Sequence, residues 1–139
     1  MDIDWEKMQQ AAYQATKQAY VPYSTYRVGA CLLTASGQLY TGCNIENASF
    51  GLTNCAERTA IFKAISEGES NFVALVVVNQ SEDYPFPCGA CRQVLSEFCS
   101  QNMPVRIANI KGEFETYQLS ELLPHAFLKK QVVSSKESQ

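Results

Sequence analysis

The feature that most constrains the fold of this chain is a nearly continuous apolar run, FVALVVV, at residues 72–78. Apolar residues without alternation over this length are typical of a central strand that is covered on both faces of its sheet. A chain of 139 residues is long enough to bury a core of this kind. The run therefore predicts a sheet with helices packed on both sides.

The patterns on either side of this run predict the remaining elements. Before it, we expect a helix at about 4–19, a hairpin at 27–44 with its turn at Ser36-Gly37, and a helix at 55–67. After it, we expect a helix following PFPC, strands at 105–110 and 113–119, and one helical turn at 120–123. This order predicts a three-layer α/β/α fold with a mixed sheet of about five strands. No linker or repeat interrupts it, so residues 1–139 should form a single domain, with a frayed tail from about residue 130.

Charge and composition limit the partners of the chain. The net charge is −3, the pI is near 5.1, and no cluster of Lys and Arg stands out, which disfavours nucleic acid as a partner. The first residues, MDIDWEKMQQ, are acidic where a secretory leader needs positive charge, and no apolar segment approaches the length of a membrane span. We therefore expect a cytoplasmic protein without membrane association, in which thiols stay reduced.

Six cysteines in such a compartment are better interpreted as metal ligands, catalytic groups or buried small residues than as disulfides. Cys88 and Cys91 lie in PFPCGACRQ at the start of a predicted helix, an arrangement that redox pairs share. Cys55 begins another predicted helix, in NCAER. If both helices pack on one side of the sheet, their N-termini can bring the three thiols together. Three thiolates are a ligand set that suits Zn²⁺.

Three protein ligands leave the fourth tetrahedral position open, which is typical of catalytic zinc. A structural site would be closed by a fourth ligand, and Cys43, Cys99 or His125 could supply it. Glu57 favours the catalytic interpretation, because a carboxylate two residues after Cys55 can act as general base and acid beside the metal. Taken alone, an acidic residue in the first helical turn would equally complement the helix dipole.

The sequence CAE at 55–57, together with PCGAC at 87–91, resembles the signature of the zinc deaminases in its three-cysteine form. Over roughly residues 20–128 the chain resembles the small, homotetrameric cytidine deaminases. The resemblance rests on PYS at 22–24, VGA at 28–30, GCNIENAS at 42–49, NCAERTA at 54–60, PCGACRQ at 87–93 and ELLP at 121–124. It implies the fold of that family, one zinc ion per chain, and a homotetramer whose active sites are shared between subunits.

The resemblance also implies a reaction. Free cytidine and 2′-deoxycytidine would be deaminated hydrolytically to uridine and 2′-deoxyuridine, with release of ammonia, as in pyrimidine salvage. Cys55, Cys88 and Cys91 would hold the zinc, and Glu57 would transfer protons among the attacking water, N3 of the base and the departing amine. Arg58 would contact a ligand thiolate and draw charge from it.

Further residues would bind the substrate, if the family pattern holds here. The backbone N–H of Ala56 would bind O2 of the base, and the carbonyl of Phe86 would contact the exocyclic amine. Asn44 and Glu46, in GCNIEN, would bind the ribose hydroxyls, with Glu46 on the 3′-hydroxyl. A pair of this kind favours a free nucleoside as the substrate.

The chain departs from the family at two positions. Tyr26 stands where phenylalanine is common and packs against substrate, and its hydroxyl needs a hydrogen-bond partner. His125 stands where glycine is common, and we assign it no role. Other matches imply residues that reach the site of a neighbouring subunit: Ala48, Phe50 and Phe127.

Other functions remain open on the residues alone. A deaminase of a related aminopyrimidine nucleoside or antibiotic would use the same zinc site. A polynucleotide-editing deaminase is disfavoured by the lack of a basic surface. A non-catalytic structural-zinc module would need a fourth ligand, whereas a thiol oxidoreductase would need Cys88 and Cys91 but neither zinc nor Glu57.

Overall fold

The computed structural model describes residues 2–132, and its elements follow the order expected from the sequence. The helices are α1 (Trp5–Thr16), α2 (Ala56–Ser66), α3 (Gly89–Phe98) and α4 (Leu119–Leu122), with a 3-10 turn, η1, at Phe50–Leu52. The strands are β1 (Val28–Thr34), β2 (Leu39–Cys43), β3 (Phe72–Asn79), β4 (Pro104–Ala108) and β5 (Phe114–Gln118).

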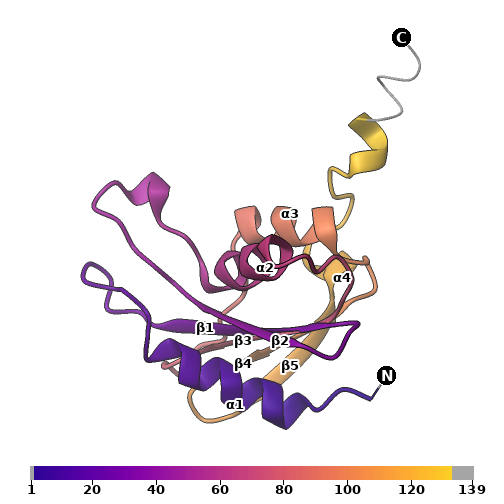
Figure 1. Ribbon diagram of the computed structural model, residues 1–139. Coiled ribbons are helices and arrows are strands. Elements are labelled where there is room, and N and C mark those ends of the chain that lie inside the picture. Colours follow the sequence, from indigo (N-terminus) through magenta and orange to yellow (C-terminus); the bar gives the residue numbers. More distant parts are fainter. Residues whose placement is uncertain (1, 133–139) are drawn as a thin grey trace.

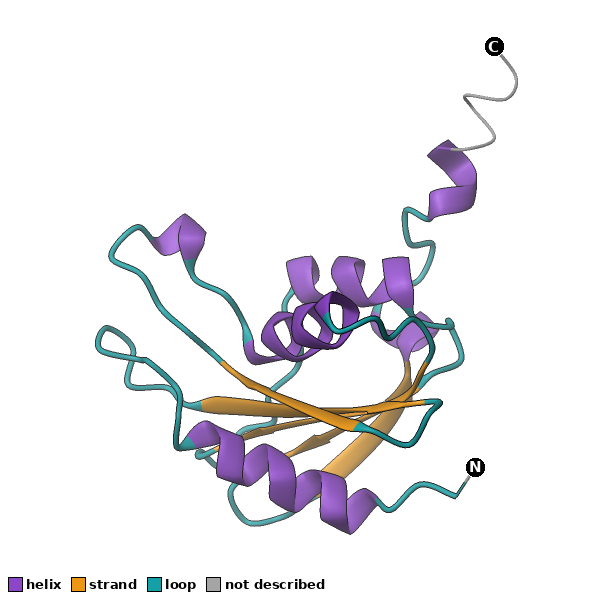
Figure 2. Ribbon diagram, viewed as in Figure 1, coloured by secondary structure: helices purple, strands orange, loops and turns teal. Residues whose placement is uncertain are grey.

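The five strands form one mixed sheet in the order β2-β1-β3-β4-β5. β3 and β4 are parallel, and the other neighbouring strands are antiparallel. α1 covers one face of the sheet, and α2 and α3 lie side by side over the other (Figure 1 and Figure 2). The expected three-layer α/β/α arrangement is confirmed.

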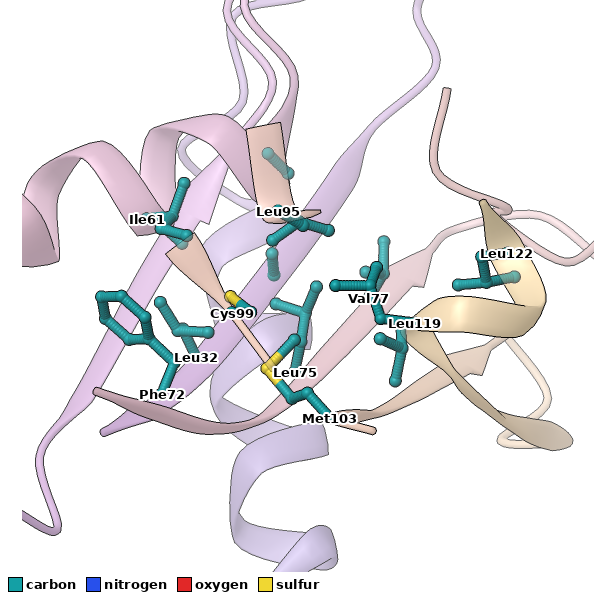
Figure 3. Close-up of a cluster of buried hydrophobic side chains, with 14 of the residues drawn as sticks. Leu32, Ile61, Phe72, Leu75, Val77, Leu95, Cys99, Met103, Leu119 and Leu122 are labelled. Atoms are coloured by element: carbon teal, nitrogen blue, oxygen red, sulfur yellow. The ribbon is translucent and has the colours of Figure 1, made fainter. Parts of the chain in front are cut away.

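The apolar run forms β3, the central strand, and its side chains alternate between two cores. Leu75 and Val77 belong to the core beneath α2 and α3, part of which is drawn in Figure 3. Val76 and Val78 belong to the core beneath α1. Because both faces of β3 are covered, the strand needs no polar side chain until its last residue.

Two glycines allow helices to lie directly on the sheet. A Cβ at Gly42 would lie 2.4 Å from the carbonyl oxygen of Ala56 and 2.5 Å from the amide nitrogen of Ala60, both in the backbone of α2. A Cβ at Gly29 would lie 2.0 Å from the carbonyl oxygen of Ala12 in α1. The absence of a side chain at Gly42 therefore fixes where the first turn of α2 sits over β2.

The end of α1 differs from the expectation. α1 ends at Thr16 rather than near residue 19, because the chain turns there and Nη1 of Arg27 binds the carbonyl oxygens of Thr16 and Ala19, at 3.1 and 2.9 Å. Residues 129–132 are helical, and most of the tail that was expected to fray from about residue 130, residues 133–139, lies outside the described residues. Within residues 2–132, no helix has the length and apolar character needed to cross a membrane.

Candidate active site

Three thiols meet at the N-termini of α2 and α3. Cys55 is the N-cap residue of α2, Cys88 is the N-cap residue of α3, and Cys91 lies in the first turn of α3. The Sγ atoms of Cys55 and Cys88 are 3.7 Å apart, and those of Cys88 and Cys91 are 3.4 Å apart. The two predicted helices thus do bring these cysteines to one spot.

The three sulfurs fit a tetrahedral zinc ion. Zn–S bonds of about 2.3 Å at tetrahedral angles place sulfurs roughly 3.8 Å apart, close to the observed separations. Among the described residues, no fourth Cys, His, Asp or Glu joins this group. Cys43, Cys99 and His125 therefore do not close the site, and the arrangement leaves one coordination position open.

Arg58 supplies positive charge beside the thiols. Its Nη2 donates to the Sγ of Cys55 at 3.4 Å, and its Nε is buried without a partner. Hydrogen bonds from the thiol of Cys91 and from Arg58 lower the pKa of Cys55 to about 5, against the opposing effect of burial. Conversely, the hydrogen bond to Cys55 and burial raise the pKa of Cys91. The group therefore already stabilises one thiolate, which is the form that binds a metal.

Glu57 is a buried carboxyl next to these sulfurs. It lies in the first turn of α2 and is only 4% exposed. Burial, with a smaller contribution from the charge of Cys55, raises the pKa of Glu57 to about 7. Glu57 does not belong to the metal-ligand group. A carboxyl in this state can both accept and donate a proton near neutral pH.

A pocket of about 200 Å³ opens over the site. Besides Cys55, Cys88 and Glu57, it is lined by four of the predicted substrate-binding residues: Tyr26, Asn44, Ala56 and Phe86. It is also lined by three residues that the sequence did not single out: Val28, Thr53 and Pro85. Val28 and Pro85 lie within the quoted motifs VGA and PFPCGACRQ, and Thr53 directly precedes NCAERTA, so the motifs and their flanks were the available signal.

Asn44 and Glu46 are both tied to the segment before β1. The Oδ1 of Asn44 accepts from the backbone N–H of Val28 at 3.0 Å, and its Nδ2 donates to the carbonyl oxygen of Tyr26 at 2.7 Å. Glu46 accepts hydrogen bonds from the backbone and hydroxyl of Ser24 and from the backbone N–H of Tyr23, which lower its pKa. Asn44 lines the pocket, whereas Glu46 does not.

The other predicted substrate contacts lie away from the pocket. Phe50, in η1, is 74% exposed, and its ring packs edge-on against that of Tyr23, with the ring centroids 6.1 Å apart. Phe127 is 64% exposed, and its carbonyl accepts a hydrogen bond from Gln93. Neither ring, nor Ala48, lines the site within this chain. His125 has a φ of 54°, a conformation that glycine adopts without strain.

Comparisons with known proteins agree with this geometry. Residues 3–107 match the family described as the cytidine and deoxycytidylate deaminase zinc-binding region. The chain is 53% identical over 127 residues to a cytidine deaminase of Sporosarcina psychrophila, which covers 91% of this chain and 93% of that protein. It is 50% identical over 125 residues to a cytidine deaminase of Halalkalibacterium halodurans, covering 90% of this chain and 95% of that protein.

Solved structures extend the agreement to the fold. The crystal structure of cytidine deaminase from Burkholderia pseudomallei matches with a TM-score of 0.87 at 42% identity, covering 90% of this chain and 100% of that chain. The structure of cytidine deaminase from Mycobacterium tuberculosis matches with a TM-score of 0.79 at 40% identity, covering 91% and 98%. In sequence, in fold and in a group of three cysteines that could hold a metal ion, the chain belongs to the zinc-binding cytidine deaminase family.

Proposed function

We propose that the chain catalyses the zinc-dependent hydrolytic deamination of free cytidine and 2′-deoxycytidine, producing uridine or 2′-deoxyuridine and ammonia for pyrimidine salvage. The observation that carries this proposal is the position of Glu57, a buried carboxyl that lines a pocket beside three thiols suited to zinc. Relatives that are cytidine deaminases support the same substrate for this chain.

In this mechanism, Glu57 handles the protons. Cys55, Cys88 and Cys91 would hold the zinc, which would supply Lewis-acid activation of a water molecule. As the water adds to C4 of the pyrimidine, Glu57 accepts one of its protons and donates it to N3. Glu57 then carries the second proton to the amine nitrogen, and the C4–N bond breaks to release ammonia. A pKa of about 7 suits both steps, because each protonation state of Glu57 is well populated at neutral pH.

Backbone groups at the pocket would orient the base. Ala56 is the first residue of α2, and an N–H at that position has no acceptor within the helix. It can therefore donate to O2 of the base. The carbonyl of Phe86, just before Pro87, would accept from the exocyclic amine. The exposed ring of Tyr26 would pack against the substrate.

Asn44 and Glu46 would bind the ribose. After its bond to the carbonyl of Tyr26, the Nδ2 of Asn44 keeps one hydrogen for a ribose hydroxyl. A carboxylate offers about four acceptor positions, and the Glu46 contacts with Tyr23 and Ser24 use three of them. One position is left for the 3′-hydroxyl. Arg58, through Cys55, would offset the negative charge of three thiolates.

Assembly would complete the site. We propose a cytoplasmic homotetramer with one zinc per chain, in which residues 1–139 form a single domain. Phe50 and Phe127, which are largely exposed in the single chain, would each close the pocket of a neighbouring subunit, together with Ala48. Burial of these rings against a neighbouring subunit would remove apolar surface from water and so favour assembly.

The test is the ultraviolet absorbance change when purified protein is mixed with cytidine, with zinc content and solution mass measured on the same sample. We expect uridine formation, about one zinc per chain and the mass of a tetramer. One zinc per chain without turnover of cytidine or 2′-deoxycytidine would contradict the proposed substrate and direct attention to another amine. A monomer that turns over cytidine would contradict only the proposal of a tetramer whose active sites are shared between subunits.

A further inference from the structure

Asn79 is a buried polar residue at the edge of the site. It is the last residue of β3, and strand alternation places it on the same face as Leu75 and Val77, beneath α2 and α3. Its side chain is fully buried, at 0% exposure. A fully buried amide must find hydrogen-bond partners within the protein.

Those partners belong to two segments that reach the pocket. The Nδ2 of Asn79 lies 2.9 Å from the hydroxyl oxygen of Tyr26 and 2.7 Å from the carbonyl oxygen of Asp83. Tyr26 itself lines the pocket, and Asp83 leads directly to Pro85 and Phe86, which also line it. One amide thus connects two parts of the pocket wall that are far apart in the sequence.

The orientation of this amide follows from its neighbours. A backbone carbonyl can only accept, so the atom that faces Asp83 must be Nδ2 rather than Oδ1. The two hydrogens of Nδ2 serve its two shortest contacts, those to Asp83 and Tyr26. The hydroxyl of Ser81, at 3.1 Å, is a third and longer neighbour. The hydroxyl oxygen of Tyr26 is therefore an acceptor, held by a donor that cannot move into solvent.

Tyr26 is held at both of its ends. Its backbone carbonyl accepts from Asn44, and its hydroxyl accepts from Asn79. Between these two bonds lies its ring; Tyr26 as a whole is 41% exposed and lines the pocket. A phenylalanine at this position would have the same ring without the second bond, so the hydroxyl adds a restraint on where the ring lies.

We propose that Asn79 is a positioning residue, which fixes the ring of Tyr26 relative to the segment that carries Phe86 and so sets the fit of the pocket to a nucleoside. This inference rests on the proposed function. Substrate binding should depend on Asn79 more than the chemical step does, because Glu57 and Cys55 are placed by α2 rather than by the end of β3.

A double-mutant cycle with cytidine as the substrate tests this inference. We expect Tyr26→Phe and Asn79→Ala each to raise KM about 5- to 10-fold, with kcat changed less than about twofold. Because the two residues act through a shared bond, the double variant should raise KM by clearly less than the product of the two single effects. Tyr26→Phe keeps the ring and removes only the hydroxyl, so it remains informative even if Asn79→Ala folds poorly.

Ser81→Ala is the matched control, because it removes a neighbour of the Asn79 amide that does not line the pocket. We expect it to leave KM within about twofold of the wild-type value. The dissociation constant for uridine, measured by calorimetry, should rise in Tyr26→Phe and Asn79→Ala by the same factors as KM. This binding readout does not depend on turnover.

The outcomes separate this inference from the proposed function. Wild-type turnover of cytidine with unchanged KM in both single variants, or with strictly multiplicative effects in the double variant, would overturn the role of Asn79 alone. An equal rise of KM in Ser81→Ala would do the same, because it would show a general effect of the loop. Wild-type protein that neither deaminates cytidine nor binds uridine would overturn both.

Discussion

Five of the six cysteines of this chain fall into two groups with opposite surroundings, and Cys43, which is half-buried at the end of β2, belongs to neither. Cys55, Cys88 and Cys91 meet at two helix N-termini beside Arg58 and the pocket. Cys31 and Cys99 lie in the hydrophobic cores, where burial raises the pKa of Cys31 to about 11 and that of Cys99 to about 12. The same side chain can therefore serve as a metal ligand in one place and is a small apolar residue in the other, and the difference lies in what surrounds it.

Two arginines repeat this contrast on opposite faces of the sheet. Arg58 directs its guanidinium at the thiol of Cys55. Arg106, on β4, lies between the rings of Trp5 and Phe114, with its guanidinium carbon 4.7 and 3.7 Å from the ring centroids. Each has a buried Nε without a partner. Arg58 thus places its charge beside the site, whereas Arg106 joins β4 to α1 through ring contacts and through Nη1, which lies 3.5 Å from Glu6 and 3.3 Å from Gln9.

The largest effect that would sharpen this comparison is loss of a site cysteine. Cys55→Ser should weaken zinc binding by more than about 100-fold and remove turnover, because it exchanges a soft ligand for a hydroxyl. Cys99→Ala should keep one zinc per chain and lower the free energy of unfolding by about 1–2 kcal/mol. Zinc content by atomic absorption and urea denaturation measure the two effects. Zinc loss in Cys99→Ala would break the division into two groups.

The next largest effect is expected for a substitution of Arg58, the arginine beside the thiols. Arg58→Gln should weaken zinc binding by about 10- to 100-fold, because Cys55 loses the positive charge that favours its thiolate. Competition with a chromophoric chelator measures the affinity. A zinc affinity equal to that of the wild type would show that the helix N-termini stabilise the thiolates sufficiently without Arg58.

Arg106→Gln is the counterpart on the other face. It should leave zinc affinity unchanged and lower the free energy of unfolding by about 1–2 kcal/mol, since it removes the cation–π contacts with Trp5 and Phe114 and the ion pair with Glu6. Urea denaturation measures the stability, and the same chelator competition checks the zinc. A change in zinc affinity here would mean that the two faces of the sheet are not independent.

The smallest effect concerns the thiols of the core. Below its pKa a thiol stays protonated, so at pH 8 roughly one in a thousand Cys31 side chains would be a thiolate. Iodoacetamide at pH 8 should therefore leave Cys31 and Cys99 unmodified in the folded protein, as judged by mass spectrometry. Their pKa values are raised on folding from 9.0, so the stability they contribute is complete below pH 9 and is lost as the pH rises toward 11 and 12. Rapid modification of Cys31 at pH 8 would contradict this.

Much of the site could be predicted because its residues lie at the starts of helices that the sequence pattern predicts. Cys55 and Cys88 each precede a run with helical spacing, and the central strand requires helices on both faces, so two helix N-termini can meet. Glu57 follows Cys55 within one turn, which places both at the same end of the helix. The sequence could not show which cysteine, if any, closes the site. That depends on distances between elements, which exclude Cys43 and Cys99.

Other features depend on contacts that no local pattern records. The bond between Asn79 and the hydroxyl of Tyr26 joins residues 53 positions apart. The burial of Arg106 could not be predicted, because VRIANI has the pattern of an ordinary strand. Its neighbours Trp5 and Phe114 come from distant parts of the chain. The end of α1 depends on Arg27, whose side chain reaches back to carbonyl oxygens before Pro22. Such long-range side-chain contacts decide details that periodicity leaves open.

The most direct test of the account is the Glu57→Gln variant, assayed for cytidine turnover and for zinc on the same sample. We propose that Glu57 moves protons beside the metal without binding it. Turnover should therefore fall by about three orders of magnitude while one zinc per chain is retained. Loss of the zinc together with the activity, or turnover close to that of the wild type, would contradict it.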